Sequence, residues 1–407
     1  MKAYANLVPG GGGCEHTRYH QVHVLNAATQ TSPAIARLGG RIYVLYAPLG
    51  LFQHAYSTST WSCPKPDDTP CGTWGGWDNH PYMDAFQGLD ALTIPGPSGT
   101  QRLLVVGTDS SGTLIQTILT VSSGVEHWTT PTRVNGSLKA TGEPSLAMYG
   151  PTAIYLVYRG TDGFVKFQAR RSDGTWTSAT SITTPDWSGI SVPDYTSPAI
   201  AFASLRWQSG PVLYGAFAAS DGRLDLWARD SSTGHWVKTD MMETRPGPVE
   251  GRPALQWVPF QSTSFVPGRL YLMFIRHNTS SPGEREINMM MSYVKKDSVS
   301  GTNKQYMGLL SPFDNVWLYG LGIDLLYTPG IDSNLRAAFT VGANYGGDNP
   351  DSPKKFQVWF RPNADGIYDY SYRNFNDWQT LQVGVCKYVV DPGDALPNST
   401  QIQCPAH

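Results

Sequence analysis

A short phrase built around a proline recurs along the chain at almost constant spacing, and this repeat limits the fold more than any other feature. It reads Ser32-Pro33-Ala34-Ile35, Glu143-Pro144-Ser145-Leu146, Ser197-Pro198-Ala199-Ile200 and Arg252-Pro253-Ala254-Leu255. The last three prolines lie 54 and 55 residues apart. An apolar strand follows each phrase. Several copies continue with a turn such as Thr161-Asp162-Gly163 and then a Gly-x-Trp segment. Units of this length with three or four short strands are typical of β-propeller blades.

Two further copies carry aspartate in what reads as the proline position. They are Gly88-Leu89-Asp90-Ala91-Leu92 and Gly322-Ile323-Asp324-Leu325-Leu326. Six copies of about 54 to 70 residues then fill most of the chain, with no helical periodicity between them. We therefore predict an all-β fold, a six-bladed β-propeller, with a seven-bladed ring as the alternative. Residues 32–385 form the propeller, residues 1–31 an arm with a ring-closing strand near His20 to Leu25, and residues 386–407 a disulfide-stapled C-terminal tail.

Charge and hydropathy exclude two classes of partner. Only 15% of the residues are charged, and 30 basic against 32 acidic residues give a net charge of -2. No basic stripe stands out, so we expect no nucleic-acid partner. No stretch approaches the 18 apolar residues of a membrane-spanning helix, so we expect no membrane span. Aromatic residues make up 12% of the chain, with 13 Trp and 21 Tyr. They are the side chains that favour strands and can stack on sugars.

The five cysteines lie around turn-rich segments near the two ends of the chain. Cys63 and Cys71 bracket one loop, and Cys386 and Cys404 bracket another. Cys14 is left over, or pairs with a C-terminal cysteine and ties the ends together. No CxxC pair occurs, so a metal site is a poor explanation. Disulfides of this kind predict an extracellular, secreted protein.

The repeat phrase, with its later Leu-Tyr strand, Thr-Asp-Gly turn and Gly-x-Trp segment, resembles the sialidase-like and lectin-like β-propellers. Ser172-Asp173-Gly174-Thr175-Trp176 is similar to a shortened form of the Asp-box turn of sialidase blades, which is a structural motif. The resemblance implies sugar binding between or within blades. An active sialidase also needs an arginine triad. Its first arginine would precede a proline on the first blade, where this chain has Thr31-Ser32-Pro33.

The residues just before or at the proline position are expected near the mouth of the central channel. They are Ser32, Asp90, Glu143, Ser197, Arg252 and Asp324. Of these, Asp90, Glu143, Asp324 and Arg252 are the candidate catalytic residues, because paired carboxylates can hydrolyse a glycosidic bond. The carboxylates could instead bind a cation such as Ca2+, the one cofactor considered. A structural interpretation is that they bond to neighbouring backbone groups and cap blade turns.

Tryptophans recur at the blade ends, and four are candidates for carbohydrate binding: Trp74, Trp77, Trp176 and Trp236. An indole face suits the C–H face of a sugar, but packing between blades also needs a large flat residue at a repeated position. Trp74 and Trp77 are expected to lie exposed on the loop after Cys71. His16 and His20 have a spacing that could hold a metal on a helix, but they are expected on a loop entering a strand, so no metal site is predicted.

Three functions remain open from the sequence. The leading one is a secreted, lectin-like propeller that binds glycans or glycoproteins. The alternatives are a glycoside hydrolase with a carboxylate and arginine cluster at the channel mouth, and a protein-interaction domain of an adhesin or toxin. Repeated, near-equivalent polar and aromatic sets favour the lectin, whereas one asymmetric cluster favours the hydrolase. Fold alone does not decide between them.

Overall fold

The structure, a computed structural model, describes most of the repeat region. The described residues are 22–24, 31–47, 51–57, 74–205, 208–242, 244–260, 267–277, 285–296, 303–313, 318–327, 335–341, 355–361, 387–389 and 401–403. Apart from one short 3-10 turn (Pro97–Gly99), every regular element in them is a β-strand.

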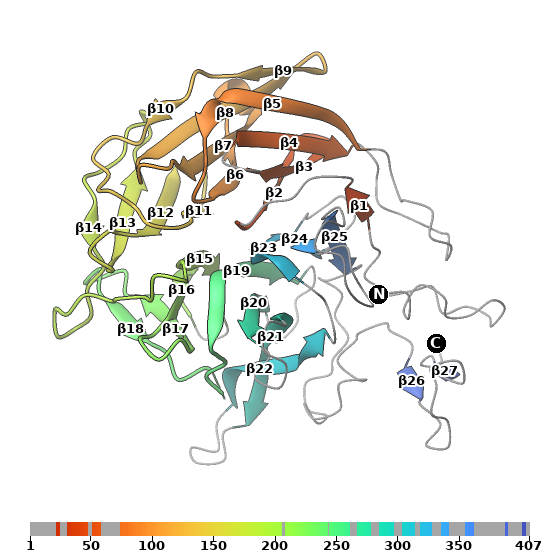
Figure 1. Cartoon of the computed structure of the whole chain (residues 1–407). Helices are drawn as coiled ribbons and strands as arrows, with labels where there is room; N and C mark the ends of the chain where they lie inside the picture. Colours follow the sequence, from red (N-terminus) through yellow and green to blue (C-terminus); the bar gives the residue numbers. More distant parts are fainter. Residues whose placement is uncertain are drawn as a thin grey trace.

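The strands form six antiparallel sheets of four or five strands among the described residues, numbered here as blades 1 to 6 (Figure 1). Blade 1 holds β2 (Ala34–Leu38), β3 (Arg41–Tyr46), β4 (Leu51–Ser57) and β5 (Trp74–Asp84). Blade 2 holds β6 (Leu89–Pro95), β7 (Gln101–Thr108), β8 (Leu114–Ser122), β9 (Val125–Trp128) and β10 (Thr132–Arg133). Blade 3 holds β11 (Ser145–Tyr149), β12 (Ala153–Arg159), β13 (Val165–Arg170) and β14 (Thr180–Ser181).

The second half of the ring follows the same plan. Blade 4 holds β15 (Ala199–Ala203), β16 (Val212–Ala218), β17 (Leu224–Arg229) and β18 (Trp236–Lys238). Blade 5 holds β19 (Val249–Pro259), β20 (Gly268–His277), β21 (Arg285–Lys296) and β22 (Asn303–Phe313). Blade 6 holds β23 (Leu318–Tyr327), β24 (Leu335–Val341), β25 (Lys355–Arg361) and β1 (Val22–Val24). A separate pair joins β26 (Lys387–Val389) to β27 (Gln401–Gln403).

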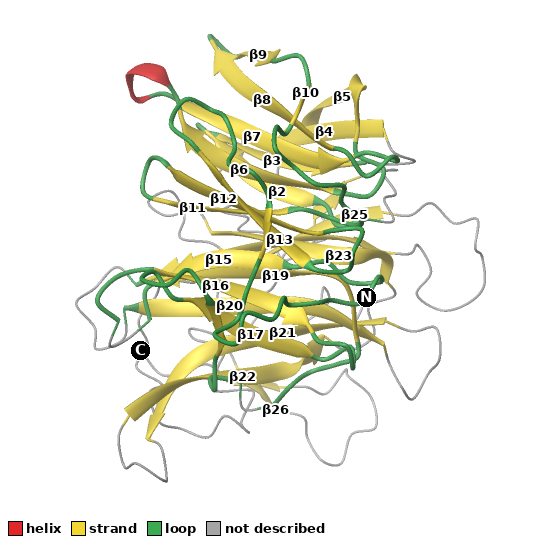
Figure 2. Cartoon of the chain, turned by 90° about the vertical axis from the view of Figure 1, so that its left-hand side faces the viewer, coloured by secondary structure: helices red, strands yellow, loops and turns green. Residues whose placement is uncertain are grey.

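The inner strands close a ring. Each of β2, β6, β11, β15, β19 and β23 contacts the next, and β23 contacts β2. Viewed from the side, the sheets of successive blades lie face to face (Figure 2). β1, which precedes the first repeat, pairs with β25 through Val22 and Val358, so the two ends of the described ring meet in one sheet. The all-β propeller predicted from the repeat is therefore confirmed.

Both faces of a blade are buried, which explains why its strands read as continuous apolar runs. In blade 3, Leu146 packs in the core shared with blade 2, and the next residue, Ala147, packs in the core shared with blade 4. Side chains alternate across a strand, so neighbouring residues serve opposite interfaces. The predicted turns are also present. Gly163 and Gly222 have φ values of 81° and 75°, which glycine adopts without steric cost.

The segment that contains Trp74 and Trp77 is a strand, not an exposed loop. Trp74 pairs with Ser57 at the outer edge of blade 1, and β5 continues to Asp84 with two register shifts. The two glycines between the tryptophans suggested a loop, but they lie within this irregular strand. All five cysteines lie outside the described residues. No helix among the described residues is long and apolar enough to cross a membrane.

Candidate functional site

The four predicted catalytic candidates do come together, around a single guanidinium. Arg252, at the inner strand of blade 5, reaches across to carboxylates of three other blades. Its Nη1 lies 3.1 Å from Asp90 Oδ2, its Nε 3.5 Å from Glu143 Oε2 and its Nη2 3.7 Å from Asp324 Oδ1. Nη1 also donates to the carbonyl of Pro144 at 2.9 Å. We call these four residues the axial cluster.

The carboxylates of the axial cluster also accept hydrogen bonds from backbone amides. Asp90 Oδ2 accepts from the amide of Leu146 on blade 3 at 2.6 Å, and Asp324 Oδ2 accepts from Ile35 on blade 1 at 2.8 Å. The hydroxyl of Ser145 makes the same bond to Ile200 on blade 4 at 3.2 Å. These bonds fasten each inner strand to the next.

The same bonds correct the alignment of the repeats. Ser145 follows the proline of its phrase, and Asp90 and Asp324 make the equivalent bond, so both occupy the position after the proline. The predicted placement in the proline position is therefore wrong by one residue. A shift of one residue moves a strand side chain to the opposite face.

In blades 2 and 6, glycine occupies the position before the one that holds proline in the other blades, because a larger residue there would collide with a side chain of the next blade. A Cβ on Gly88 would lie 2.4 Å from Glu143 Cγ, and one on Gly322 would lie 1.4 Å from Ser32 Oγ. Each glycine therefore admits the side chain of the neighbouring blade. The ring of residues before the proline reads Ser32, Gly88, Glu143, Ser197, Arg252 and Gly322. The two long side chains in this ring, Glu143 and Arg252, are thus separated by small residues on both sides.

The environment of the axial cluster suits a structural role. Asp90 and Glu143 are only 6% and 5% exposed, so a saccharide has little access to either carboxylate. Burial raises the pKa of Glu143, although the Arg252 charge acts against this shift. Burial and then the Asp90 charge raise the pKa of Asp324. The carboxylates outweigh the effect of burial on Arg252 and raise its pKa, so this guanidinium stays charged.

The raised pKa of Glu143 predicts that stability falls as the pH rises. In the folded protein this carboxyl retains a proton that it loses in the unfolded chain above about pH 4.3. The unfolded state thus binds fewer protons, and the free energy of unfolding declines until the pH passes the raised pKa. Glu143→Gln removes this titration and keeps an acceptor for the Ser32 amide. Urea unfolding at about pH 5 and about pH 8 should show a smaller difference for the variant than for the parent. An unchanged difference would exclude Glu143 as the group involved.

Trp176 and Trp236 pack between blades and are not available to a sugar. Each is 1% exposed. The indole N–H of Trp176 donates to Gln116 Oε1 of blade 2 at 2.9 Å, and Trp236 packs edge-on against Phe217 at 5.3 Å. The packing role considered for the blade-end tryptophans is the one that these two fulfil. The side chains of Trp74 and Trp77 are outside the described part of the structure.

A charged and aromatic cluster occupies the junction between blades 1 and 2. Glu126 Oε1 accepts from Arg41 Nη1 and from the Tyr43 hydroxyl, both at 2.9 Å, and its Oε2 lies 2.7 Å from His54 Nε2. Burial acts to raise the pKa of Glu126, but the bonds from His54 and Tyr43 and the Arg41 charge lower it. Arg41 also stacks over the ring of Tyr56 at 4.1 Å. The carboxylate is thus held ionised at this junction.

Arginine recurs at the start of the second strand of three blades. These arginines occupy the same position in their blades. In blades 1, 2 and 5 the residue after the proline position pairs with Leu45, Val106 and Met273, respectively. Arg41, Arg102 and Arg269 each lie four residues before that pairing partner. Arg41 faces the next blade, where it pairs with Glu126. Arg269 lies over the ring of Phe260 of its own blade at 5.2 Å. The repeat phrase did not single out this set, although the strands Arg41 to Tyr46, Arg102 to Val106 and Arg269 to Ile275 all begin with arginine.

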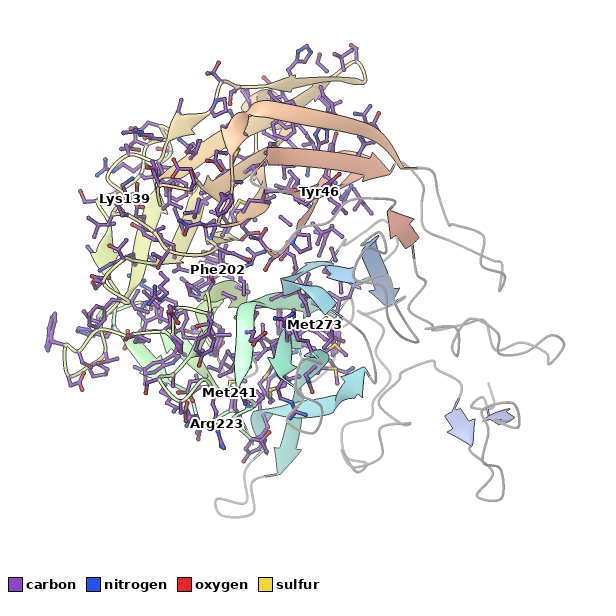
Figure 3. The ribbon with its side chains drawn as sticks, in the orientation of Figure 1. Tyr46, Lys139, Phe202, Arg223, Met241 and Met273 are labelled. Carbon is purple, nitrogen blue, oxygen red and sulfur yellow. The ribbon has the colours of Figure 1, made fainter. Side chains whose placement is uncertain are left out.

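The junction between blades 3 and 4 carries an aromatic cluster with one guanidinium. Tyr149, which is 49% exposed, lies 5.3 Å from Phe202 (labelled in Figure 3), and Tyr155 stacks on Phe167 at 5.3 Å. Arg229 of blade 4 lies over the Phe167 ring at 5.2 Å. Within the described residues, this guanidinium has no carboxylate partner. The arrangement offers ring faces together with hydrogen-bond donors.

Trp187 is the most exposed large hydrophobic side chain among the described residues, at 74%, and the sequence analysis also missed it. It lies on a tight turn in which its amide donates to the Thr184 carbonyl, while Asp186 accepts from the Ser188 amide. Its φ of 67° is unusual for a bulky residue. The ring of His235 packs against it edge-on at 4.4 Å. The Pro185-Asp186-Trp187-Ser188-Gly189 turn sequence was the signal that could have identified it.

Several residues considered in the sequence fall outside the described residues: His16, His20 and the cysteines Cys14, Cys63, Cys71, Cys386 and Cys404. Where the structure is described, no group of three or more His, Cys, Asp or Glu side chains is arranged to hold a metal ion. The axial carboxylates hold Arg252 in the position that a cation such as Ca2+ would need.

Solved structures share this fold at low sequence identity. AofleA from Arthrobotrys oligospora is 12% identical over 91% of this chain and 94% of its own, with a TM-score of 0.52. A variant of the Aleuria aurantia lectin in complex with Fucalpha1-6GlcNAc is 13% identical over 85% of this chain and 100% of its own, with a TM-score of 0.51. Trypanosoma rangeli sialidase is 10% identical over 93% and 61%, with a TM-score of 0.49. No family model and no curated protein matches the sequence.

The β-propeller fold of this chain is therefore similar to the folds of AofleA and the Aleuria aurantia lectin. At these identities the likeness concerns the fold alone. The chemistry of the site comes from the side chains of this chain, which place arginine and aromatic residues at several junctions between blades.

Proposed function

We propose that this protein is a secreted lectin that binds glycans at the junctions between its blades. The observation that carries the proposal is the recurrence of guanidinium groups over aromatic rings, at the blade 1–2 junction, at the blade 3–4 junction and in blade 5: Arg41 over Tyr56, Arg229 over Phe167 and Arg269 over Phe260. Aromatic rings bind the C–H face of a sugar, and guanidinium N–H groups donate to its hydroxyls.

The junction between blades 3 and 4 fits this role best. Tyr149 exposes half of its side chain beside Phe202, and Arg229 has N–H groups not engaged by a carboxylate. Tyr149 and Arg229 stand at the two ends of one aromatic cluster, which runs through Phe202, Tyr155 and Phe167, so a saccharide of more than one ring could contact both. Similar sets at other junctions would give several weak sites in one chain, and several sites raise the strength of binding to a glycan-coated surface.

Two further features support the proposal. One of the solved structures with this fold is described as a lectin in complex with a fucose-containing disaccharide. The cysteine pattern at Cys63 and Cys71 and at Cys386 and Cys404 suits disulfides in an extracellular protein, where glycoproteins would be the partners.

A glycan array probed with the whole chain tests the proposal. We expect binding to a group of related glycans, because equivalent junctions should share a preference. Binding to none of several hundred glycans would overturn the carbohydrate function. Release of free sugar from bound glycans would instead indicate a hydrolase, and capture of glycoproteins that persists after their glycans are removed would indicate a protein-interaction domain.

Tyr149→Ala should weaken binding of the best array glycan by roughly 2- to 10-fold, the worth of one aromatic contact. Titration calorimetry of parent and variant with the soluble glycan measures the change. Phe86→Ala is the matched control, because Phe86 is an aromatic residue of similar exposure (57%) outside the blade 3–4 junction. Equal affinities for the parent and Tyr149→Ala would move the binding site away from this junction.

A further inference from the structure

Two arginines lie at the junction between blades 2 and 3, and neither pairs with a carboxylate of the described residues. Arg102 starts the second strand of blade 2, and Arg170 ends the third strand of blade 3. Arg102 is close enough for its charge to act on Arg170. Arg102 Nη2 donates to the Pro95 carbonyl at 3.1 Å. Among the described residues, neither guanidinium has an ion-pair partner, and both Nε atoms are buried without a hydrogen bond.

Comparison with the junction between blades 1 and 2 shows that the blade 2–3 junction lacks a carboxylate. Arg102 occupies the strand position of Arg41, which is paired with Glu126. Glu126 lies two residues before Trp128, which pairs with Leu119. One blade later, Trp176 forms the equivalent bridge to Arg170.

The residue two before Trp176 is Gly174. The carboxylate present at the first junction is therefore replaced by a glycine at the second. Gly174 has a φ of 88°, and a Cβ built on it would lie 3.0 Å from Arg170 Nη2. The glycine leaves the guanidinium uncovered where Glu126 would otherwise stand.

The charges at this junction are not balanced from within. Burial and then the Arg102 charge lower the pKa of Arg170, whereas the Asp173 charge raises it. The Asp173 carboxylate is itself exposed and accepts hydrogen bonds from the amide and hydroxyl of Thr175. Two like charges held together at a half-buried position favour an anion that can pair with both.

We infer that the blade 2–3 junction binds the carboxylate of an acidic sugar, which takes the position that Glu126 fills at the blade 1–2 junction. This inference rests on the proposed carbohydrate function and makes it more specific. A carboxylate presents two oxygens that match the planar fork of a guanidinium, and Gly174 leaves the fork of Arg170 open to it. Trp176, whose backbone bridges to Arg170, is itself held in place by the bond of its buried indole to Gln116.

The test compares glycans that end in glucuronic acid with their methyl esters, which differ only in the charge of the carboxyl group. The parent should bind the acid at least about tenfold more tightly than the ester. Arg102→Gln and Arg170→Gln should lose this preference. Arg171→Gln, which removes the same charge at the next, exposed position, should keep it.

The outcomes separate this inference from the proposed function. Equal binding of acid and ester by the parent, or a preference that survives in Arg170→Gln, overturns the acidic-sugar site and leaves the lectin in place. Absence of binding to either form, together with a blank glycan array, overturns both. Sulfate at constant ionic strength supplies a readout without sugar: it should raise the Tm of the parent more than that of Arg170→Gln. An equal rise also contradicts the site.

Discussion

Arg252→Met is expected to lower the free energy of unfolding by about 3–5 kcal/mol, the usual cost of removing one partner from a buried ion-pair network. The change leaves the carboxylates of Asp90, Glu143 and Asp324 buried without their shared cation. It also removes the bonds to the carbonyls of Pro144 and Pro33, which link blade 5 to blades 3 and 1. Methionine preserves most of the side-chain volume, so the effect measures charge and hydrogen bonding.

Urea unfolding followed by circular dichroism measures this loss. Arg245→Met is the control, because Arg245 pairs with Asp221 at the surface and the buried Asp225 keeps its ion pair with Lys238 when Arg245 is removed. A surface pair of this kind contributes at most about 1 kcal/mol. An Arg252 variant that does not fold agrees with the expectation. Equal stability of the two variants would show that the axial cluster does not hold the ring together.

Gly322→Ala is expected to destabilise the fold by about 1–3 kcal/mol or more, the cost of overpacking a close-packed interior. The added methyl group would lie 1.4 Å from Ser32 Oγ, so one of the two inner strands must move. These strands, β23 and β2, join the last blade of the ring to the first. The clash therefore falls where the ring closes.

A double variant separates this clash from other effects of the alanine. Ser32→Gly removes the atoms that the new methyl group meets, so it should restore part of the stability of Gly322→Ala. Gly40→Ala is the control, since a Cβ there meets nothing within 4 Å. It should be neutral or stabilise by up to about 1 kcal/mol. Thermal unfolding that shows no rescue by Ser32→Gly would contradict the packing described at the axis.

Local features of this chain were predictable from the sequence. The Thr161-Asp162-Gly163 turn forms because glycine accepts a positive φ and the aspartate carboxylate caps the turn, accepting from the Phe164 amide. Both effects depend on residues only a few positions apart. The apolar strands and the order of the blades follow from the same kind of local pattern repeated along the chain.

The features that were missed depend on which face of a strand a residue occupies. Reading Asp90 one position early changes its face and hides its bond to Leu146 of the next blade. Trp176 looked like an exposed sugar platform because its burial against Gln116 comes from another blade. Arg41 looked like an ordinary strand end until Glu126 was placed beside it. In each case the partner is more than 50 residues away and belongs to a neighbouring blade.

The axial cluster and the blade junctions divide the polar side chains of this protein into two groups. The carboxylates at the axis are buried and bonded to backbone amides and Arg252, so they act on the fold. Arg229 at the blade 3–4 junction is half-buried beside the Phe167 ring and has no carboxylate partner among the described residues, so its N–H groups can act on a ligand. Arg41 is instead engaged by Glu126.

A crystal structure of the chain with the best glycan from the array tests this division most directly. We predict the sugar at a junction between two blades, in contact with an aromatic side chain such as Tyr149 or with an arginine such as Arg229. A sugar bound instead at the axis, in contact with Asp90, Glu143 or Arg252, would contradict the account and identify the axial cluster as the functional site.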